Sequence, residues 1–399
     1  MTLYFQGAYE PQLYTTVLPA FEASHPGIHV SAVLPPSPST RDTQLIQAFV
    51  AGSGPDVFWS DAPWAFARGP WLLDLTPLVQ RDGYDLAAFS AGQLLATERQ
   101  GGLYGLPRTT NPSVFAARTD AFARAGVALP QGTYTAAELA AVWRKLSVRG
   151  KRAGGEINWS PTATYYLRGF GGHLVDPADD LRCVLDQPAA VACGQWIWDR
   201  FWTDDSARGL QGQNGWATFA AGTLAMVVVN AAALPGLTLL YANLPWRLLP
   251  FPRWPAGQAT STTSEFYAIH AGTPHREAAW ELLQFVTSTQ WENASIATAL
   301  LPPARRALWP AFLAALRQRV PGLAGQPLDV FASAPQEGWT YPPETFRYQS
   351  AALAVLNPTW QRIFAGAHAL PVARGFAALA PAVTAAERQA AAATALPGG

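Results

Sequence analysis

Residues 43–60, TQLIQAFVAGSGPDVFWS, predict a helix, a tight turn and a buried strand in direct succession. Apolar residues recur at helical spacing as far as Val50, and Gly-Ser-Gly-Pro-Asp at 52–56 then interrupts the pattern. The glycines precede a strand instead of following one, and no Gly-Lys-Ser/Thr sequence continues them, so a nucleotide-binding loop is excluded. We therefore interpret this segment as the turn between a helix and a strand.

The residues before this stretch repeat the same alternation. "TLYFQ" at 2–6 and "HPGIHVSAV" at 25–33 have strand character. One helical face lies between them and consists of Leu13, Val17, Leu18 and Phe21. Strand, helix, strand, helix, strand is typical of a parallel sheet with right-handed crossovers, so the predicted fold class is α/β.

The first strand raises a question of origin. Residues 3–7, LYFQG, match the core of a protease site that is placed behind purification tags. The Glu-Asn that completes such a site is missing before Leu3, and the predicted sheet needs a strand at this place. We interpret LYFQG as a native strand, with a cloning remnant as the alternative.

The composition is that of a well-packed globular protein. At 399 residues the chain exceeds the usual size of one core, so two lobes are expected. Hydrophobic residues make up 49% and charged residues 14%, which excludes a disordered chain. The 27 basic residues balance 27 acidic ones, so nothing indicates nucleic-acid binding. No apolar run is long enough to predict a membrane span.

The sequence leaves the cellular compartment open. Two cysteines, Cys183 and Cys193, are too few for a metal site built on thiolates. They either pair as a disulfide or, as we expect, remain separate thiols. The chain begins at Met1 without a basic segment and an apolar segment after it, so the protein is either cytoplasmic or has lost a signal segment.

A second region opens with a helix signal. Thr135 and Glu138 have the spacing of a capping box, in which each side chain satisfies an amide of the first turn. Three further helices are expected, at 188–202, at 274–289 and from 376 onward. For the second of them we predict Thr273 as N-cap and Pro274 as the first helical residue, a position that proline favours.

No enzyme motif stands out. The sequence contains neither a G-x-S-x-G elbow nor an H-E-x-x-H helix. His25 and His29, like His270 and His275, lie around proline and glycine without carboxylates at helical spacing, so we expect turn residues and not metal ligands. A carboxylate pair of a glycoside hydrolase stays open, because its members are distant along a chain.

Aromatic and small polar residues instead gather where strands end. The chain has 16 tryptophans, and Asp61 and Trp64 follow the predicted strand at 56–60. Ligands of open α/β sheets bind beyond the carboxyl ends of the strands. An indole packs against the C–H face of a sugar, and polar side chains satisfy its hydroxyls, so this pattern favours binding over bond cleavage. Trp143 and Trp280 lie on helical stripes and are expected in the core.

Eight segments follow one another along residues 1–305: FEASHPGIHV, AFVAGSGPDVFWSDAPW, LLDLTPLV, GGLYGLPRTTN, FAARTDAFARAGVALP, LDQPAAVACGQWIWD, FAAGTLAMVV and HREAAWELLQFVTS. In this order they resemble the extracellular solute-binding proteins (family 1) of bacterial ABC importers. The resemblance is to the sugar-binding branch, which includes maltose- and multiple-sugar-binding proteins. One departure is that Ser264-Glu265 replaces the glycine pair that usually precedes the last strand of the ligand cleft.

The resemblance implies a non-enzymatic protein with a type II periplasmic-binding-protein-like α/β fold, in which two lobes and a hinge enclose a ligand cleft. Lobe one is expected at 1–110 plus 266–315, and lobe two at 111–265 plus 316–399. The implied partners are a small carbohydrate and the membrane permease subunits of an ABC importer. It implies no cofactor, metal or nucleic acid. A monomer is expected outside the cytoplasm, in the periplasm or lipid-anchored at the cell surface, after loss of a signal segment.

The resemblance also implies a set of ligand-binding residues. Carried over by position, they are Gln6, Tyr9, Asp61, Trp64, Arg108, Asn111, Tyr165, Phe170, Gly171, Asn230, Ser264, Glu265 and Arg305. Trp254 and Trp339 are added because they place aromatic surface in proline-rich loops.

Two alternatives stay open. A phosphorylated ligand such as a glycerophosphodiester is one, with Arg108 and Arg305 as the obvious phosphate partners. A carbohydrate-active enzyme is the other, and incubation with glycans separates it from a binding protein, since only an enzyme releases product.

Overall fold

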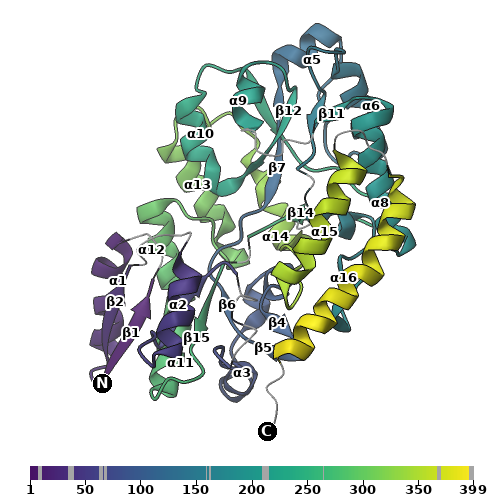
Figure 1. Ribbon diagram of the computed structural model, residues 1–399. Coiled ribbons are helices and arrows are strands. Elements are labelled where there is room, and N and C mark those ends of the chain that lie inside the picture. The colour runs from purple at the N-terminus through teal and green to yellow at the C-terminus, as the bar shows by residue number, and fades with distance from the viewer. Residues whose placement is uncertain are drawn as a thin grey trace. The chain divides into compact units, whose positions relative to one another are not determined.

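The computed structural model describes residues 1–7, 11–34, 40–62, 66, 70–158, 160, 163–208, 215–263, 265–365 and 370–394. The chain divides into two compact units (Figure 1). Unit 1 comprises Met1–Asn111, Thr262–Arg319 and Pro335–Gly338, and unit 2 comprises Pro112–Ser261, Val320–Ala334 and Trp339–Gly399. Within the described ranges, no helix is long and apolar enough to cross a membrane.

Unit 1 is built on a five-stranded sheet with the order β2-β1-β3-β15-β6. These strands are β1 (Thr2–Gln6), β2 (His29–Val33), β3 (Val57–Ser60), β6 (Leu106–Pro107) and β15 (Phe266–Ile269). The longer helices are α1 (Pro11–Ser24), α2 (Arg41–Val50), α3 (Thr76–Asp82), α11 (Arg276–Val286), α12 (Thr289–Ala299) and α13 (Trp309–Arg319). β1 pairs in parallel with β2 and β3, whereas β15 runs antiparallel to β3 and β6. The predicted α/β fold class is confirmed.

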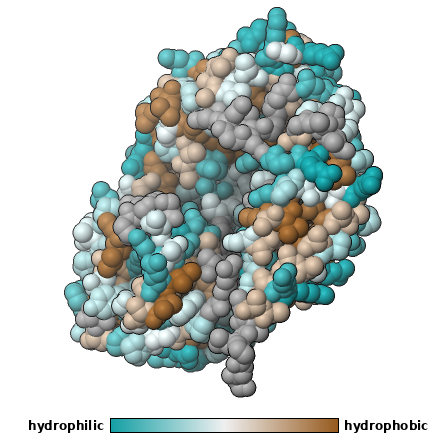
Figure 2. All heavy atoms as spheres, in the orientation of Figure 1, coloured by the Kyte–Doolittle hydropathy of each residue, from teal (hydrophilic) through white to brown (hydrophobic). Residues whose placement is uncertain are grey.

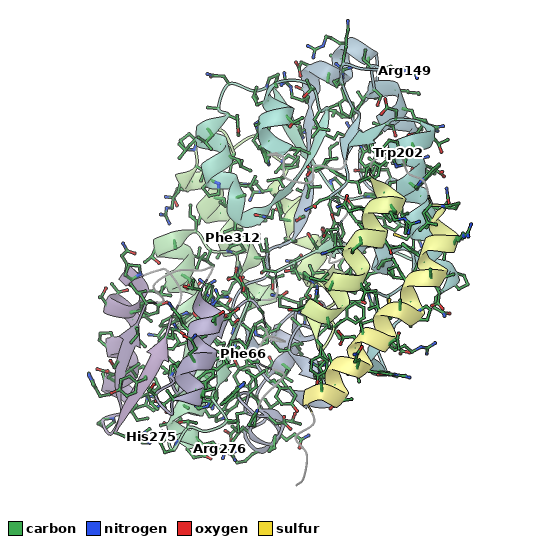
Figure 3. The ribbon with its side chains drawn as sticks, in the orientation of Figure 1. Phe66, Arg149, Trp202, His275, Arg276 and Phe312 are labelled. Carbon is green, nitrogen blue, oxygen red and sulfur yellow. The ribbon has the colours of Figure 1, made fainter. Side chains whose placement is uncertain are left out.

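Successive residues of β3 face opposite layers of unit 1. Val57 and Trp59 pack into a core that includes residues of α1, α11 and α12. Phe58, between them, packs on the other face against Phe49 of α2 and Phe66, with ring centroids 5.2 Å away in both cases. Phe66 is labelled in Figure 3. β3 is therefore covered on both faces, which is why it reads as a nearly unbroken apolar run.

The turn at 52–56 requires both of its glycines. Gly52 has φ +68°, a backbone conformation that side chains disfavour. A Cβ on Gly54 would lie 2.1 Å from the Phe49 ring, so the chain passes the helix at a distance that only glycine allows. Asp56 then exchanges two bonds with Tyr4, one between the backbones and one from Tyr4 N to the Asp56 carboxylate, each 2.8 Å long. The predicted turn is confirmed.

Residues 3–6 of the LYFQG segment lie in strand β1, as predicted, and Gly7 directly follows the strand. Leu3 and Phe5 are fully buried, and the Phe5 ring lies 5.6 Å from Tyr14, 5.7 Å from Tyr267 and 6.3 Å from Trp291. Tyr4 points the other way and is 53% exposed. Phe5 thus anchors β1 in the core, and Tyr4 adds little burial.

Phe5→Ala should lower the free energy of unfolding by about 3–5 kcal/mol, because it leaves a cavity among three aromatic rings. The neighbouring change Tyr4→Ala should cost less than about 1 kcal/mol, because that side chain is largely in solvent. Urea denaturation of both variants measures the difference. Equal losses for the two would contradict the burial pattern of β1.

Unit 2 combines a three-stranded sheet, order β12-β7-β13, with several two-stranded ladders. Its strands are β7 (Ser113–Arg118), β8 (Gly155–Glu156), β9 (Val175–Asp176), β10 (Asp179–Cys183), β11 (Ala207–Arg208), β12 (Met226–Asn230), β13 (Trp246–Leu249), β14 (Thr260–Ser261) and β16 (Thr340–Tyr341). The longer helices are α5 (Thr119–Ala125), α6 (Ala136–Leu146), α8 (Pro188–Trp198), α10 (Leu234–Leu240), α15 (Gln349–Phe364) and α16 (Val372–Thr394). α15 and α16 lie side by side (Figure 1).

The helix start predicted at the capping box is right, and other predicted boundaries need correction. The capping box is present, with Glu138 N donating to Thr135 Oγ1 at 3.2 Å. The tail forms the helix α16, but this helix begins at Val372, four residues before the predicted start at 376. The helix expected at 188–202 turns into a π-helical segment at Asp199–Thr203. α11 begins at Arg276 with His275 as N-cap, so the prediction of Thr273 and Pro274 was wrong. The Thr273 hydroxyl instead donates to Asp56 and accepts from His275 N.

Unit 2 contains buried thiols and also apolar side chains that are exposed to solvent. Cys183 and Cys193 are free and buried, and burial raises the pKa of both thiols. Exposed apolar side chains include Leu239 and Leu240, at the end of α10. On the face shown in Figure 2, apolar residues are dispersed in small groups among hydrophilic ones.

Candidate functional site

Four predicted ligand residues lie at one edge of the unit 1 sheet: Gln6, Asp61, Arg108 and Glu265. Gln6 ends β1, and Asp61 and Arg108 directly follow β3 and β6. Because β15 runs antiparallel to both of those strands, its first residue, Phe266, lies opposite Ser60 and Pro107. Glu265, one residue earlier, is thereby placed at the same edge, where α/β sheets bind ligands.

Arg41 is the centre of a network at this edge. Its guanidinium is only 1% exposed and donates to Asp42 at 2.8 and 3.2 Å and to Asp61 at 2.5 Å. It also stacks on Trp59, 3.9 Å from the ring centroid. Burial alone would lower the pKa of Arg41, but the bonds and charges of Asp42 and Asp61 outweigh it and hold the pKa above its usual value. Arg41 is therefore a fixed cation.

A second arginine pairs with the predicted acidic residue. Arg108 donates a side-chain hydrogen bond to the Glu265 carboxylate, and its backbone N–H donates to Glu265 O at 3.0 Å. The Arg108 guanidinium lies 5.5 Å from the centroid of Trp59, which therefore has two arginines near its ring. Glu265 thus neutralises the side chain that sequence reasoning took as a phosphate partner.

The remaining polar groups of unit 1 are placed as follows. Gln6 is 9% exposed, and no described residue donates to its Oε1. Asn111 donates its backbone N–H to Thr262 Oγ1 at 3.0 Å. Tyr9, Trp64 and Ser264 lie outside the described residues.

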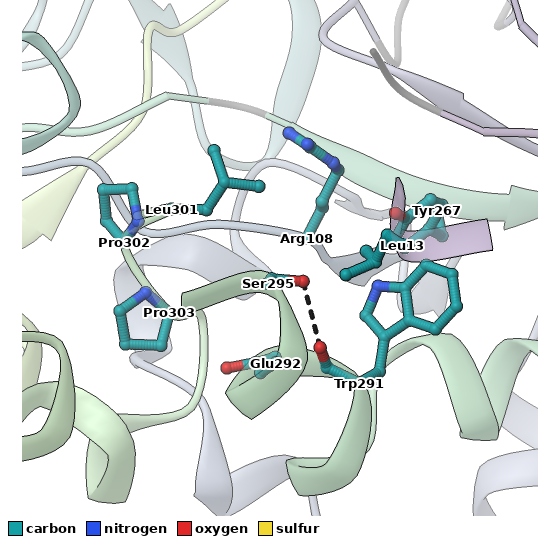
Figure 4. Close-up of a pocket in the computed structure, with 9 residues that line it drawn as sticks. All are labelled: Leu13, Arg108, Tyr267, Trp291, Glu292, Ser295, Leu301, Pro302 and Pro303. Carbon is teal, nitrogen blue, oxygen red and sulfur yellow. Dashed lines mark hydrogen bonds between the residues drawn. The ribbon is translucent and has the colours of Figure 1, made fainter. Parts of the chain in front are cut away.

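Unit 1 also contains a small cavity (Figure 4). Its lining consists of Leu13, Arg108, Tyr267, Trp291, Glu292, Ser295, Leu301, Pro302 and Pro303. The cavity measures about 10 Å³, the room of a single water molecule, whereas small-molecule sites usually measure about 300–1,000 Å³. It is therefore too small to enclose a sugar.

Glu292 is the buried ionisable group of this cavity. Its Oε2 accepts from Arg305 N at 3.0 Å, and its Oε1 has no partner among the described residues. The Arg305 guanidinium turns to Thr287 O, 2.7 Å away, and to Tyr84 Oη, 3.1 Å away. Arg305, predicted as a ligand residue, therefore holds together segments of unit 1. Burial raises the pKa of Glu292 to about 8, although the Arg305 N–H and charge act in the opposite direction.

This raised pKa predicts a pH-dependent stability. Between pH 4.5 and pH 8, Glu292 keeps its proton when folded and loses it when unfolded. Its contribution to stability is therefore full below about pH 4.5, falls with each pH unit above that, and is lost once the pH has risen through about 8. Glu292→Gln removes the effect, so the variant should gain stability relative to the unaltered protein by up to about 1.4 kcal/mol per pH unit.

Chemical denaturation at pH 5, 6, 7 and 8 measures this gain. Glu281→Gln, at an exposed position of α11, is the charge-matched control and should show a constant difference from the unaltered protein. A constant difference for Glu292→Gln as well would show that Glu292 is ionised throughout.

In unit 2, several predicted ligand residues lie at the ends of a strand and of a helix. Asn230 ends β12, and its Oδ1 accepts from Ala233 N at 2.9 Å, which caps the following turn. Tyr165 begins α7 (Tyr165–Gly169) and is 6% exposed. Phe170 and Gly171 end this helix, and Gly171 has φ +80°, so a side chain there would strain the backbone.

The two added tryptophans differ from each other. Trp254 is 1% exposed, packs edge to face with Tyr166 and Trp196, and donates its indole N–H to Ala259 O at 3.0 Å. It is a core residue with no aromatic face on the surface, because a turn folds it under α7. Trp339 precedes β16 and is half-buried.

Sequence reasoning missed Arg41, Asp42 and Trp59. Trp59 lies inside β3, within the strand predicted at 56–60, and its ring lies beside two guanidinium groups. Arg41-Asp42 begins α2, where an acidic residue is ordinary, so the local pattern gave no reason to single the pair out. Arg41 and Asp42 lie at this edge because α2 starts after the carboxyl end of β2 and then leads the chain back to the start of β3.

The sequence was compared with models of known protein families. A family model of bacterial extracellular solute-binding proteins matches residues 7–293, more than half of the chain. The chain belongs to this family. The family resemblance predicted from the sequence is confirmed.

Individual relatives of this solute-binding protein are distant in sequence. The sugar-binding protein MalE of Xanthomonas citri has a similar structure, with a TM-score of 0.80, 19% identity and full coverage of both chains. UgpB of Mycobacterium tuberculosis, solved with glycerophosphocholine, has a TM-score of 0.72 and 19% identity over 98% of this chain and 99% of that one. An uncharacterised lipoprotein from the oleD 5′ region of Streptomyces antibioticus is 24% identical over 72% of this chain and 66% of its own length. The chain thus spans just under two thirds of that relative, and the two structures support the fold alone.

Proposed function

We propose that this solute-binding protein captures an uncharged sugar or oligosaccharide and delivers it to the permease of an ABC importer. The observation that carries the proposal is the edge of the unit 1 sheet, where Gln6, Asp61 and Glu265 offer acceptors for hydroxyl groups beside the ring of Trp59. Such a set can orient a sugar by hydrogen bonds. Membership of the family and the similarity to a sugar-binding MalE support it.

The charges at this edge favour a neutral ligand over a phosphodiester. Arg41 is bound by Asp42 and Asp61, and Arg108 is bound by Glu265. Among the described residues of this network, two arginines therefore face three carboxylates, an excess of one negative charge. A phosphate group would have to break these pairs before it gained its own. The similarity to UgpB keeps a glycerophosphodiester as the second candidate.

The proposal extends to partners and location. Units 1 and 2 would be the two lobes, and the second unit would offer the ligand residues Tyr165, Phe170, Gly171, Asn230 and Trp339. Tyr9, Trp64 and Ser264 complete the proposed set from the sequence. The protein would act as a monomer outside the cytoplasm, in keeping with its family and with a lipoprotein among its relatives, and would not turn over its ligand.

A sugar of this class should raise the melting temperature, because a ligand that binds only the native state stabilises it. Maltose, maltotriose, trehalose, galactose and glycerophosphocholine can be compared by thermal shift, and hits confirmed by calorimetry and by analysis for released products. Exclusive binding of glycerophosphocholine would overturn the sugar assignment. Product release above the blank would make the protein an enzyme.

Glu265→Gln should change the preference between ligand classes. The variant removes the carboxylate that neutralises Arg108, so binding of a neutral sugar should weaken by about 1–3 kcal/mol through loss of a charged acceptor, while binding of glycerophosphocholine should strengthen. Titration calorimetry with both compounds measures the ratio, and Glu281→Gln serves as the control. An unchanged ratio would place Glu265 outside the ligand's reach.

A further inference from the structure

Glu156 of unit 2 is held in place by an unusual strand. The sequence Ala153-Gly154-Gly155-Glu156 runs against α6, where a Cβ on Gly154 would lie 2.1 Å from the Trp143 backbone and one on Gly155 would lie 2.0 Å from the Trp143 indole. Only two successive glycines allow this approach. The strand ends one residue later, and its last side chain is carried into the interior, 8% exposed.

The carboxylate lies where two parallel strands end. Ala153 bridges Leu224 in parallel orientation, so β8 and β12 run in the same direction. Glu156 Oε2 accepts from Val228 N at 3.0 Å, and β12 ends two residues further on at Asn230. This is the edge at which α/β proteins bind ligands, now in unit 2.

Among the described residues, Val228 N–H is the one hydrogen-bond donor to Glu156. The titratable groups near it are the Tyr165 and Tyr166 hydroxyls of α7, and Cys193 of α8 beyond them. β12 carries no titratable side chain, and α6 faces β8 with Trp143. Arg208 is the register partner on β11, and its side chain lies outside the described residues. Burial raises the pKa of Glu156 to about 7, with the Val228 N–H acting in the opposite direction.

We propose that Glu156 is a ligand-binding residue that accepts a hydrogen bond from a hydroxyl group of the sugar and makes binding depend on its ionisation. This inference rests on the proposed function. The ionised carboxylate can accept bonds from Val228 N–H and a sugar hydroxyl at once, and the bound hydroxyl replaces water that burial has removed. A phosphate at this place would meet a like charge, so Glu156 selects against anionic ligands.

A purely structural role makes a different prediction. If Glu156 serves β12 alone, it does so by accepting the hydrogen bond of the Val228 N–H. In that case a glutamine can replace it, because the amide oxygen of Gln also accepts from Val228 N–H. Glu156→Gln would then leave affinity and its pH dependence unchanged. The isosteric variant thus separates the two roles without a change of shape.

The experiment is calorimetric titration at pH 6, 7 and 8 with the tightest-binding sugar among maltose, maltotriose, trehalose and galactose. If the ionised form binds, affinity of the unaltered protein should rise about tenfold from pH 6 to pH 8, as the ionised fraction rises through a pKa of about 7. Glu156→Gln should bind more weakly than the unaltered protein at pH 8 and show a flat profile. Glu281→Gln should follow the unaltered protein.

The outcomes are distinct. A flat profile of the unaltered protein, or equal affinities and profiles for it and Glu156→Gln, overturns the inference and leaves the proposed function standing. Failure of every sugar to bind the unaltered protein overturns the proposed function, and this inference with it. The profile of the unaltered protein decides the question even if the variant does not fold.

Discussion

Parallel pairing of β1 with β3 is the constraint on which the proposed site of unit 1 depends. It places the carboxyl ends of these strands at one edge, and the antiparallel strand β15 then delivers its own beginning to the same place. Residues more than 250 positions apart, such as Gln6 and Glu265, come together for this reason. Phe5 of β1 is buried in the core and holds this strand in the sheet. The same packing therefore stabilises unit 1 and positions the residues at its sheet edge.

Ionisable side chains are buried in two different ways in this protein. In unit 1 the cation Arg41 is buried together with two carboxylates and an indole ring, which keep it ionised. Glu156 and Glu292 are buried with backbone N–H partners, and a proton compensates for the missing countercharge near neutral pH. Arg41 stays charged in its ion pairs. A buried carboxyl without a countercharge loses its proton when a hydrogen-bond donor reaches it.

The sequence supports the fold well and the site in part. Helix-turn-strand periodicity predicts β1, β2 and β3 and the glycine turn, because these depend on neighbouring residues. Strand ends indicate Asp61 and Arg108 by the same local logic. The pairings of Arg41 with Asp61 and of Arg108 with Glu265 join segments 20 and 157 residues apart, and no local pattern encodes them. Glu156 escaped notice because its burial follows from two glycines packed against Trp143, a tertiary contact between β8 and α6 that the periodicity of neither element reveals.

The abundance of tryptophan has a consequence for spectroscopy. Trp143, Trp254, Trp280, Trp309 and Trp360 are fully buried, so their fluorescence reports the integrity of the fold and responds little to a ligand at the sheet edges. Trp59 is different, because its ring lies close to two guanidinium groups whose field acts on the excited indole. A change of emission on binding would therefore come from a small part of the total signal. Replacing background tryptophans by phenylalanine would turn Trp59 into a local reporter of the charges around it.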